Sequence, residues 1–189
     1  PAFERGMSLH DAEIDAITSN NDEPTFENTI LAYDNAGQML AQTELIFGML
    51  CAAETNERMQ ALQEQVMPLL SAHRDKIRLD EKLFARVKDV YDRRASLGLD
   101  AEQSRLLRKT YDAFVRSGAL LDAGQKARLK EINGELSLTA VKFGNNILAE
   151  NNNFALELTA DDLEGLPSGV RDAAREKAQA MGKGDKWVF

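Results

Sequence analysis

The sequence predicts a mainly α-helical fold. We expect an antiparallel, bundle-like array of about six to seven helices, with short strand segments only at 154–158 and 186–189. Apolar residues recur at spacings of three and four over most of the chain, which is the period of an amphipathic helix. The 189 residues are 43% apolar and 29% charged, a composition typical of a globular protein with a hydrophobic core. With four prolines and no long Gly/Ser tract, the chain shows no flexible linker.

The first two predicted helices lie on either side of Pro24. The first covers 3–18, and its apolar stripe contains Phe3, Met7, Ile14 and Ile17. Proline is disfavoured inside a helix but is tolerated at its edge. The hydroxyl of Thr25 can accept a hydrogen bond from a backbone N–H two or three residues on, and Glu27 suits the positive end of the helix dipole. The second helix is therefore predicted to run from near Thr25 to about Ala53.

The stretch "NNDEPTFENTI" (20–30) is rich in side-chain oxygen atoms, so a cation site is the alternative interpretation. A calcium loop of the EF-hand type needs oxygen ligands at alternate positions, a glycine at the sharp turn and a final glutamate. Here proline and threonine occupy the fifth and sixth positions. Helix capping accounts for the same residues without an ion, and we interpret the stretch as a helix start.

Four further helices follow, at 56–78, 80–97, 101–117 and 122–150. Apolar residues with near-heptad spacing predict the first of them, and Asp80 precedes the second. Asp100 and Gln103 have the spacing of a capping box at the start of the third. The longest helix carries an apolar stripe of six residues: Leu129, Ile132, Leu136, Ala140, Phe143 and Ile147.

After Asn153 the helical period ends. "FALEL" (154–158) alternates like a short strand, a helix is predicted after Gly169, and "KWVF" (186–189) is strand-like with no visible partner. The predicted domains are a helical region, 1–153, and the beginning of a following strand and helix segment, 154–189. We expect that second segment to be truncated at its C-terminal end.

Charge and apolar patterning argue against two classes of partner. The net charge of −8 disfavours non-specific nucleic-acid binding, which needs a basic surface. The apolar run "LIFGMLCAA" (45–53) has nine residues, too few to span a bilayer. The single cysteine in it, Cys51, cannot form an internal disulfide and is expected to be a small buried thiol. Basic residues gather in 105–142, which we interpret as solvated helix faces rather than as an anion-binding patch.

The sequence predicts no catalytic residue and no metal ligand, and it identifies no substrate-binding residue. Only two histidines are present, and no His-Glu-x-x-His motif occurs. His73 lies on an apolar stripe and is expected to be a hydrogen-bonded core residue; His10 borders a stripe, where a surface position is the alternative. No Gly-x-Ser-x-Gly elbow and no glycine-rich phosphate loop is present. Lys126 and Lys130 are candidates for binding a peptide carboxylate, although a solvated helix face is the favoured interpretation.

Several stretches nevertheless resemble the amino-terminal part of bacterial peptidyl-dipeptidases, which belong to the thimet-oligopeptidase family of zinc metallopeptidases. The resemblance covers essentially the whole chain, and the long-helix segment is its most specific part. The turn at 96–100 and the cap at 23–29 favour the dipeptidyl carboxypeptidase branch over oligopeptidase A. The stretches are "PAFERGM" (1–7), "EPTFENTI" (23–30), "RRASLGLD" (93–100), "FVRSGALL" (114–121), "KARLKEINGELSLTAVKFGNNILAEN" (126–151) and "GDKWVF" (184–189).

The resemblance implies a longer parent enzyme that releases dipeptides from the carboxyl ends of oligopeptides. Its zinc ligands, in a His-Glu-x-x-His motif with a further glutamate, are expected downstream of Phe189, so this chain alone holds no zinc and is expected to be inactive. The helices here are expected to form a channel wall and cover, with the catalytic domain of the same polypeptide as their partner. A cytoplasmic location is expected, or a periplasmic one if a removed signal preceded Pro1.

A stand-alone helical interaction module without catalysis is the alternative function. It predicts a well-packed C-terminus with a polar exterior, and the apolar ending "KWVF" argues against it. A peptide-binding but non-catalytic relative of the same family is the third possibility.

Overall fold

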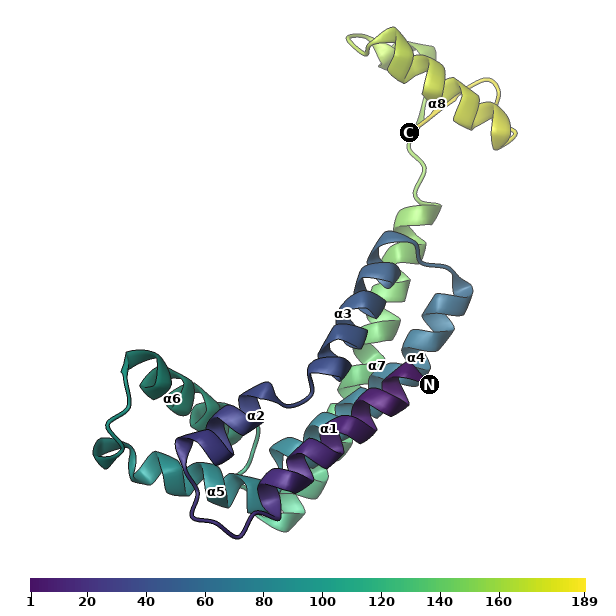
Figure 1. Cartoon of the computed structure of the whole chain (residues 1–189). Helices are drawn as coiled ribbons and strands as arrows, with labels where there is room; N and C mark the ends of the chain where they lie inside the picture. The colour runs from purple at the N-terminus through teal and green to yellow at the C-terminus, as the bar shows by residue number, and fades with distance from the viewer. The chain divides into compact units, whose positions relative to one another are not determined.

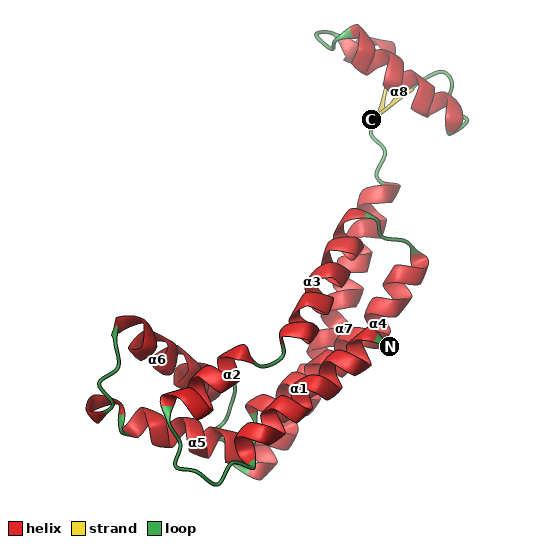
Figure 2. Cartoon of the chain, in the orientation of Figure 1, coloured by secondary structure: helices red, strands yellow, loops and turns green.

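The computed structural model describes all residues from Pro1 to Phe189 and confirms the mainly α-helical fold class (Figures 1 and 2). The chain forms two compact units, Pro1–Lys142 and Phe143–Phe189. The boundary between them lies within the longest helix, α7 (Ala123–Asn153), and the predicted domain boundary at 153/154 coincides with the end of that helix.

The first unit is built from helices and short helical turns. Most predicted helices are confirmed to within a few residues at their ends. In chain order the elements are α1 (Ala2–Thr18), the π-helical segment η1 (Phe26–Leu31), α2 (Ala32–Asn35), α3 (Gln38–Ala53), α4 (Glu57–Arg78), α5 (Glu81–Asp92), the 3₁₀ turn η2 (Arg94–Ser96), α6 (Ala101–Arg116) and α7.

The predicted continuous helix from Thr25 to Ala53 is wrong, because the chain breaks at Ala36 and Gly37 (Figure 1). Ala36 is extended, and Gly37 has a φ of 77°, in the left-handed region that favours glycine. A Cβ atom on Gly37 would lie 2.8 Å from the ring of His10, so the close approach of α1 also requires glycine. The Gly37 N–H donates a 2.6 Å hydrogen bond to the Glu13 carboxylate, which satisfies the backbone at the break.

The predicted helix 80–97 is too long. Helix α5 ends at Asp92, and the chain continues as the separate turn η2 before the cap of α6. The Ser96 hydroxyl donates a 2.8 Å hydrogen bond to the Arg93 carbonyl and so closes this turn. Small polar side chains compete for backbone groups in this way at helix ends.

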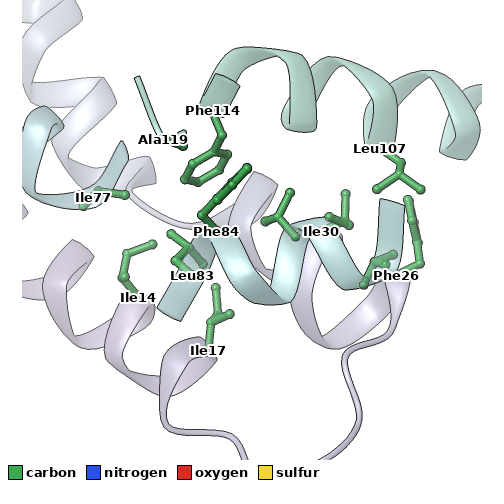
Figure 3. Close-up of a cluster of buried hydrophobic side chains, with 12 residues drawn as sticks. Ile14, Ile17, Phe26, Ile30, Ile77, Leu83, Phe84, Leu107, Phe114 and Ala119 are labelled. Carbon is green, nitrogen blue, oxygen red and sulfur yellow. The ribbon is translucent and has the colours of Figure 1, made fainter. Parts of the chain in front are cut away.

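The main hydrophobic core of the first unit lies where α1, η1, α5 and α6 meet (Figure 3). Leu83, Val87 and Val90 place one face of α5 in this core, with Leu83 fully buried. Phe84 and Phe114 stack with their ring centroids 6.0 Å apart. A second, smaller cluster is formed by Leu40 of α3 with Val66 and Leu70 of α4. Helices α5 and α6 therefore bury more apolar side chains than α3, of which only Leu40 is buried.

Replacing Gly134 with alanine is expected to stabilise the first unit by about 0.5–1 kcal/mol, because glycine weakens a helix interior. Gly134 lies inside α7, and an added Cβ would meet no atom within 4 Å. Urea unfolding followed by circular dichroism measures the change. Gly118→Ala is the matched control and should destabilise the protein, because Gly118 has a φ of 94° and its Cβ would lie 2.7 Å from Leu129. A Gly134→Ala variant as unstable as Gly118→Ala would contradict the prediction.

The second unit contains the two short strands β1 (Glu157–Leu158) and β2 (Trp187–Val188), with the turn η3 (Ala160–Leu163) and helix α8 (Ser168–Ala180) between them. Only two residues of the predicted strand 154–158 are in the sheet. The prediction that "KWVF" has no partner is wrong, because β2 pairs antiparallel with β1, Leu158 opposite Trp187. Leu156 and Phe189 extend the pairing by exchanging backbone hydrogen bonds of 3.1 and 3.0 Å.

Ionic and aromatic contacts hold this small sheet against α8 and its following turn. Both Lys183 and Lys186 donate to the Glu157 carboxylate and lower the pKa of Glu157 to about 2. The guanidinium of Arg175, on α8, lies 4.9 Å from the ring centroid of Trp187. Val188 is buried, so β2 supplies part of the unit's small core.

Candidate functional site

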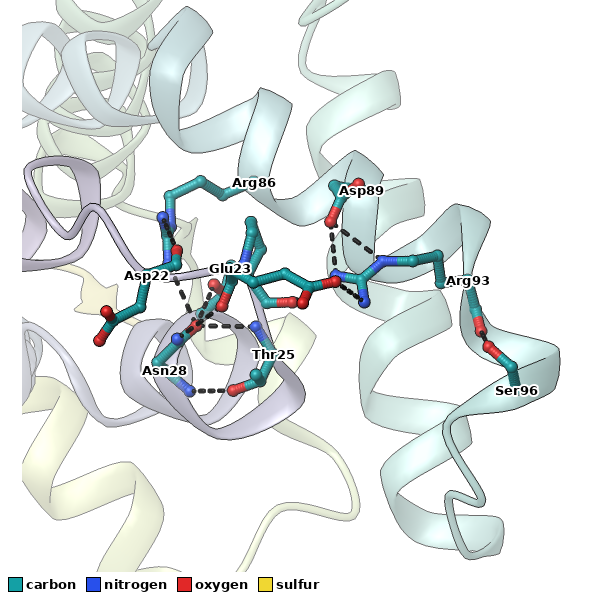
Figure 4. Close-up of polar contacts among 10 residues, drawn as sticks. Asp22, Glu23, Thr25, Asn28, Arg86, Asp89, Arg93 and Ser96 are labelled. Atoms are coloured by element: carbon teal, nitrogen blue, oxygen red, sulfur yellow. Dashed lines mark hydrogen bonds and ion pairs between the residues drawn. The ribbon is translucent and has the colours of Figure 1, made fainter.

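The oxygen-rich stretch 20–30 is a helix start, as the sequence predicts (Figure 4). The Asn28 N–H donates a 3.1 Å hydrogen bond to the Thr25 hydroxyl, and the Thr25 N–H donates a 2.8 Å bond to the Asn28 side-chain oxygen. The Asn28 amide nitrogen donates a further 3.0 Å bond to the Glu23 carbonyl. These side chains therefore satisfy the free backbone groups of a helix N-terminus.

Two arginines of α5 and its C-terminal end bind the same stretch, and the sequence analysis missed both. Arg86 donates hydrogen bonds of 2.7 Å to the Asn20 carbonyl and 3.1 Å to the Asn28 side-chain oxygen. Arg93 donates a 2.6 Å bond to the Glu23 carboxylate. The positive charge that faces these oxygen atoms is thus a guanidinium of the protein itself. No local pattern predicts these pairs, because the partners are 58 to 70 residues apart in sequence.

The two histidines lie together between α1 and α4. His73 is 7% exposed, as the prediction of a core histidine requires, and its Nε2 lies 3.2 Å from Nδ1 of His10. His10 is half-buried against it, so the fully surface alternative for His10 is wrong. The carboxylate of Asp11 lies 3.7 Å from Nδ1 of His73. The same carboxylate forms an ion pair with Lys76, whose Nζ lies 2.9 Å from the Asp11 oxygen. One ring N–H can thus be shared between the two imidazoles.

The surroundings of this histidine pair favour the neutral form of both rings. Burial lowers the pKa of His10, and the neighbouring His73 lowers it further, while Glu13 and Asp11 oppose this shift. Burial also lowers the pKa of His73, with Asp11 as the main opposing charge. Two rings in hydrogen-bond contact cannot both take up a proton without bringing like charges together.

The free energy of unfolding is expected to fall as the pH is lowered from 7.5 to 5.5. The histidines take up protons near pH 6.5 in the unfolded chain but only at lower pH in the folded one. The unfolded state therefore binds more protons below pH 6.5, and the stability from the neutral pair is fully present only above that pH. Urea unfolding at several pH values measures the slope. His10→Gln should give a shallower slope, and an unchanged slope would contradict this assignment.

The histidine pair does not fit a zinc site. Zinc in proteins takes three or four ligands from Cys, His, Asp and Glu. No group of three or more such side chains in the structure is placed so that it could hold a metal ion. His10 and His73 face each other, and Asp11 is already paired with Lys76.

The structure also changes the interpretation of Lys126 and Cys51. Lys126 is 9% exposed, and its ammonium donates a 3.1 Å hydrogen bond to the Glu81 carboxylate. The solvated-face interpretation is therefore wrong for Lys126. Lys130 is exposed, as the solvated-face interpretation predicts. The expectation of a buried thiol at Cys51 is also wrong, because Cys51 is only half-buried.

An apolar groove of about 610 Å³ lies between α1, α3 and α4, and we call it the α1–α3–α4 groove. Its lining includes Phe3 and Met7 from α1, Ile46 and Leu50 from α3, and Leu62 and Leu69 from α4. Its polar lining residues are Glu4, Thr43 and Gln65. Its mainly apolar lining suits this groove to binding an apolar surface. None of the helices combines the length and the continuous apolar character that a membrane-spanning helix requires.

No family profile matches the chain, but curated proteins match it over its whole length. It is 38% identical over 190 residues to the dipeptidyl carboxypeptidase of Escherichia coli strain K12, and 37% identical over 192 residues to that of Salmonella typhimurium strain LT2. Both alignments cover 100% of this chain and 28% of the relative. A thimet-like oligopeptidase of Dictyostelium discoideum is 27% identical over 146 residues, 76% of this chain and 21% of that protein. The chain thus spans little more than a quarter of the length of the two dipeptidyl carboxypeptidases and about a fifth of the length of the oligopeptidase.

Proposed function

Because the chain belongs to the family of the dipeptidyl carboxypeptidases and thimet-like oligopeptidases, we propose that it is a structural portion of a zinc-dependent peptidase. The whole enzyme would release dipeptides from the carboxyl ends of oligopeptides. The observation that carries this proposal is the alignment of the entire chain, at 38% identity, with a dipeptidyl carboxypeptidase.

In this proposal the 189 residues supply scaffold and not chemistry. Their polar side chains cap helices, pair with one another or cross-link elements, as Thr25, Arg86 and Lys126 do. The zinc ligands and the general base belong to another part of the polypeptide, which is the partner of these helices. The helices themselves form part of the wall and cover of the channel that admits oligopeptides.

The test compares the 189-residue chain with the protein encoded by the longest reading frame that contains it. Both are incubated with an oligopeptide that has a free C-terminal carboxylate, and the products are identified by mass spectrometry. We expect the longer protein to release dipeptides stepwise from the C-terminus, to lose this activity with a chelator and to regain it with zinc. The same peptide with an amidated C-terminus is the control substrate and should be cleaved far more slowly.

A longer protein that binds the peptide but never cleaves it would overturn the proposed peptidase and support a non-catalytic relative. If no longer reading frame contains the chain, the helical interaction module becomes the function to test. The pairing of β2 with β1 is relevant here, because it removes the unpaired apolar strand that argued against such a module.

A further inference from the structure

Helix α3 has the sequence of a helix buried on all sides. Its sixteen residues, "QMLAQTELIFGMLCAA", contain one charged side chain, Glu44, and apolar residues occur around the whole circumference. A helix that is apolar all round normally lies in the core of a large protein or in a membrane. In this structure only Leu40 of α3 is buried. Four large apolar side chains are more than half exposed: Leu45 (65%), Ile46 (60%), Met49 (64%) and Leu50 (52%).

One side of α3 lines the α1–α3–α4 groove. The edge-to-face contact of Phe3 with Phe47, with ring centroids 5.3 Å apart, joins α1 to α3 within it. On the α4 side, Leu62 and Leu69 are exposed and line the groove. Three helices therefore line the same volume of about 610 Å³ with apolar side chains, and those of α3 and α4 include exposed ones. Exposed apolar surface of this kind marks an interaction site.

We propose that an apolar helix of the remaining polypeptide binds in the α1–α3–α4 groove and makes α3 an interior helix of the whole protein. This inference rests on the proposed function, because the occupant belongs to the same polypeptide. The length of the relatives indicates this occupant. The chain covers 28% of each dipeptidyl carboxypeptidase, so 72% of each relative lies outside the aligned part and can supply such a helix. A helix in an apolar groove is a recurring mode of recognition, with anchors spaced by three and four residues.

The first test places a charge in the groove of both the 189-residue chain and the longer protein. Leu50→Glu and Ile46→Glu change exposed side chains in the short chain, so its Tm should move by no more than about 2 °C. In the longer protein the same carboxylates would be buried without a partner, and the Tm should fall by at least about 5 °C. Leu120→Glu is the matched control: Leu120 is 63% exposed, lies outside the groove and should be tolerated in both proteins.

The second test needs no destabilising variant and uses Cys51, the single cysteine of the chain. Cys51 lies on α3 next to Leu50 and is half-buried here. Its alkylation by a maleimide, followed by peptide mass spectrometry, should be at least about tenfold slower in the longer protein than in the short chain, because a covered thiol reacts only after local opening. Equal alkylation rates in the two proteins would overturn the proposal.

Two further outcomes separate this inference from the proposed function. A longer protein that cleaves peptides but tolerates Leu50→Glu would overturn the groove assignment and leave the peptidase in place. A longer protein without peptidase activity, in which Cys51 is protected, would overturn the peptidase and keep the groove. Sedimentation of the short chain tests the remaining occupant: a dimer that Leu50→Glu abolishes would show that a second copy fills the groove, which contradicts the proposal.

Discussion

Replacing Leu83 with alanine is expected to lower the free energy of unfolding of the first unit by about 2–5 kcal/mol. Leu83 is fully buried at the start of α5, in the cluster shown in Figure 3, where α1 and α5 meet. Its truncation removes apolar contacts and leaves a cavity, because the surrounding helices relax only in part. Urea unfolding monitored by circular dichroism measures the loss.

Leu45→Ala is the matched control for this prediction. Leu45 is also a helical leucine of the first unit, but it is 65% exposed, so its truncation in the 189-residue chain should change the free energy of unfolding by less than about 0.5 kcal/mol. If both variants lose the same stability, the core does not lie where the structure places it.

Replacing Arg86 with alanine is expected to lower the free energy of unfolding by about 1–3 kcal/mol. The Arg86 guanidinium joins α5 to the segment before η1, by donating to the carbonyls of Asn20 and Asp22, and to η1 itself, by donating to the side chain of Asn28 (Figure 4). The contacts with Asn20 and Asn28 are partly buried, so water compensates only in part for the loss of these two hydrogen bonds. Hydrogen exchange should become faster at 20–28 before it changes in α6.

Arg94→Ala is the control for Arg86→Ala. Arg94 is exposed and makes local contacts only, donating to the Tyr91 carbonyl and lying 4.3 Å from the ring centroid of Tyr91. Its removal should leave stability and the exchange of 20–28 nearly unchanged. If the two variants behave alike, the contacts of Arg86 with 20–28 do not stabilise the fold as predicted.

The sequence predicted the helix starts of the first unit because local chemistry determines them. Thr25, Asp80 and Asp100 each accept a hydrogen bond from a backbone N–H three residues on, as their spacing indicates. The break at Gly37 was missed because it depends on His10 and Glu13, which reach it from α1. Strong helical periodicity on both sides of residue 37 concealed that tertiary contact.

Periodicity also predicts an apolar stripe without showing what covers it. The longest helix was predicted at 122–150 and is observed as Ala123–Asn153, yet Ile132 and Leu136 of its stripe are exposed. Instead, Asn133 and Ser137 lie half-buried, and Asn133 donates a 2.8 Å hydrogen bond to Asp75 of α4. Which face of a helix is covered depends on its partners, and these are not encoded in the spacing of its own residues.

The contact between His10 and His73 was equally beyond sequence reasoning. A core position for His73 followed from its apolar stripe, but a partner 63 residues away has no local signature. By contrast, Thr25 caps a helix, His73 is packed in the interior and Arg86 cross-links two elements. The family assignment therefore rests on the alignments with known proteins and not on the chemistry of a site.

We propose that these helices are the scaffold of a peptidase whose zinc is held elsewhere. The most direct measurement determines zinc content and dipeptide release together, on the purified 189-residue chain dialysed against a small excess of zinc. We predict less than stoichiometric zinc and no release of dipeptides from an oligopeptide. One tightly bound zinc per chain, with peptide cleavage that a chelator abolishes and zinc restores, would contradict the claim.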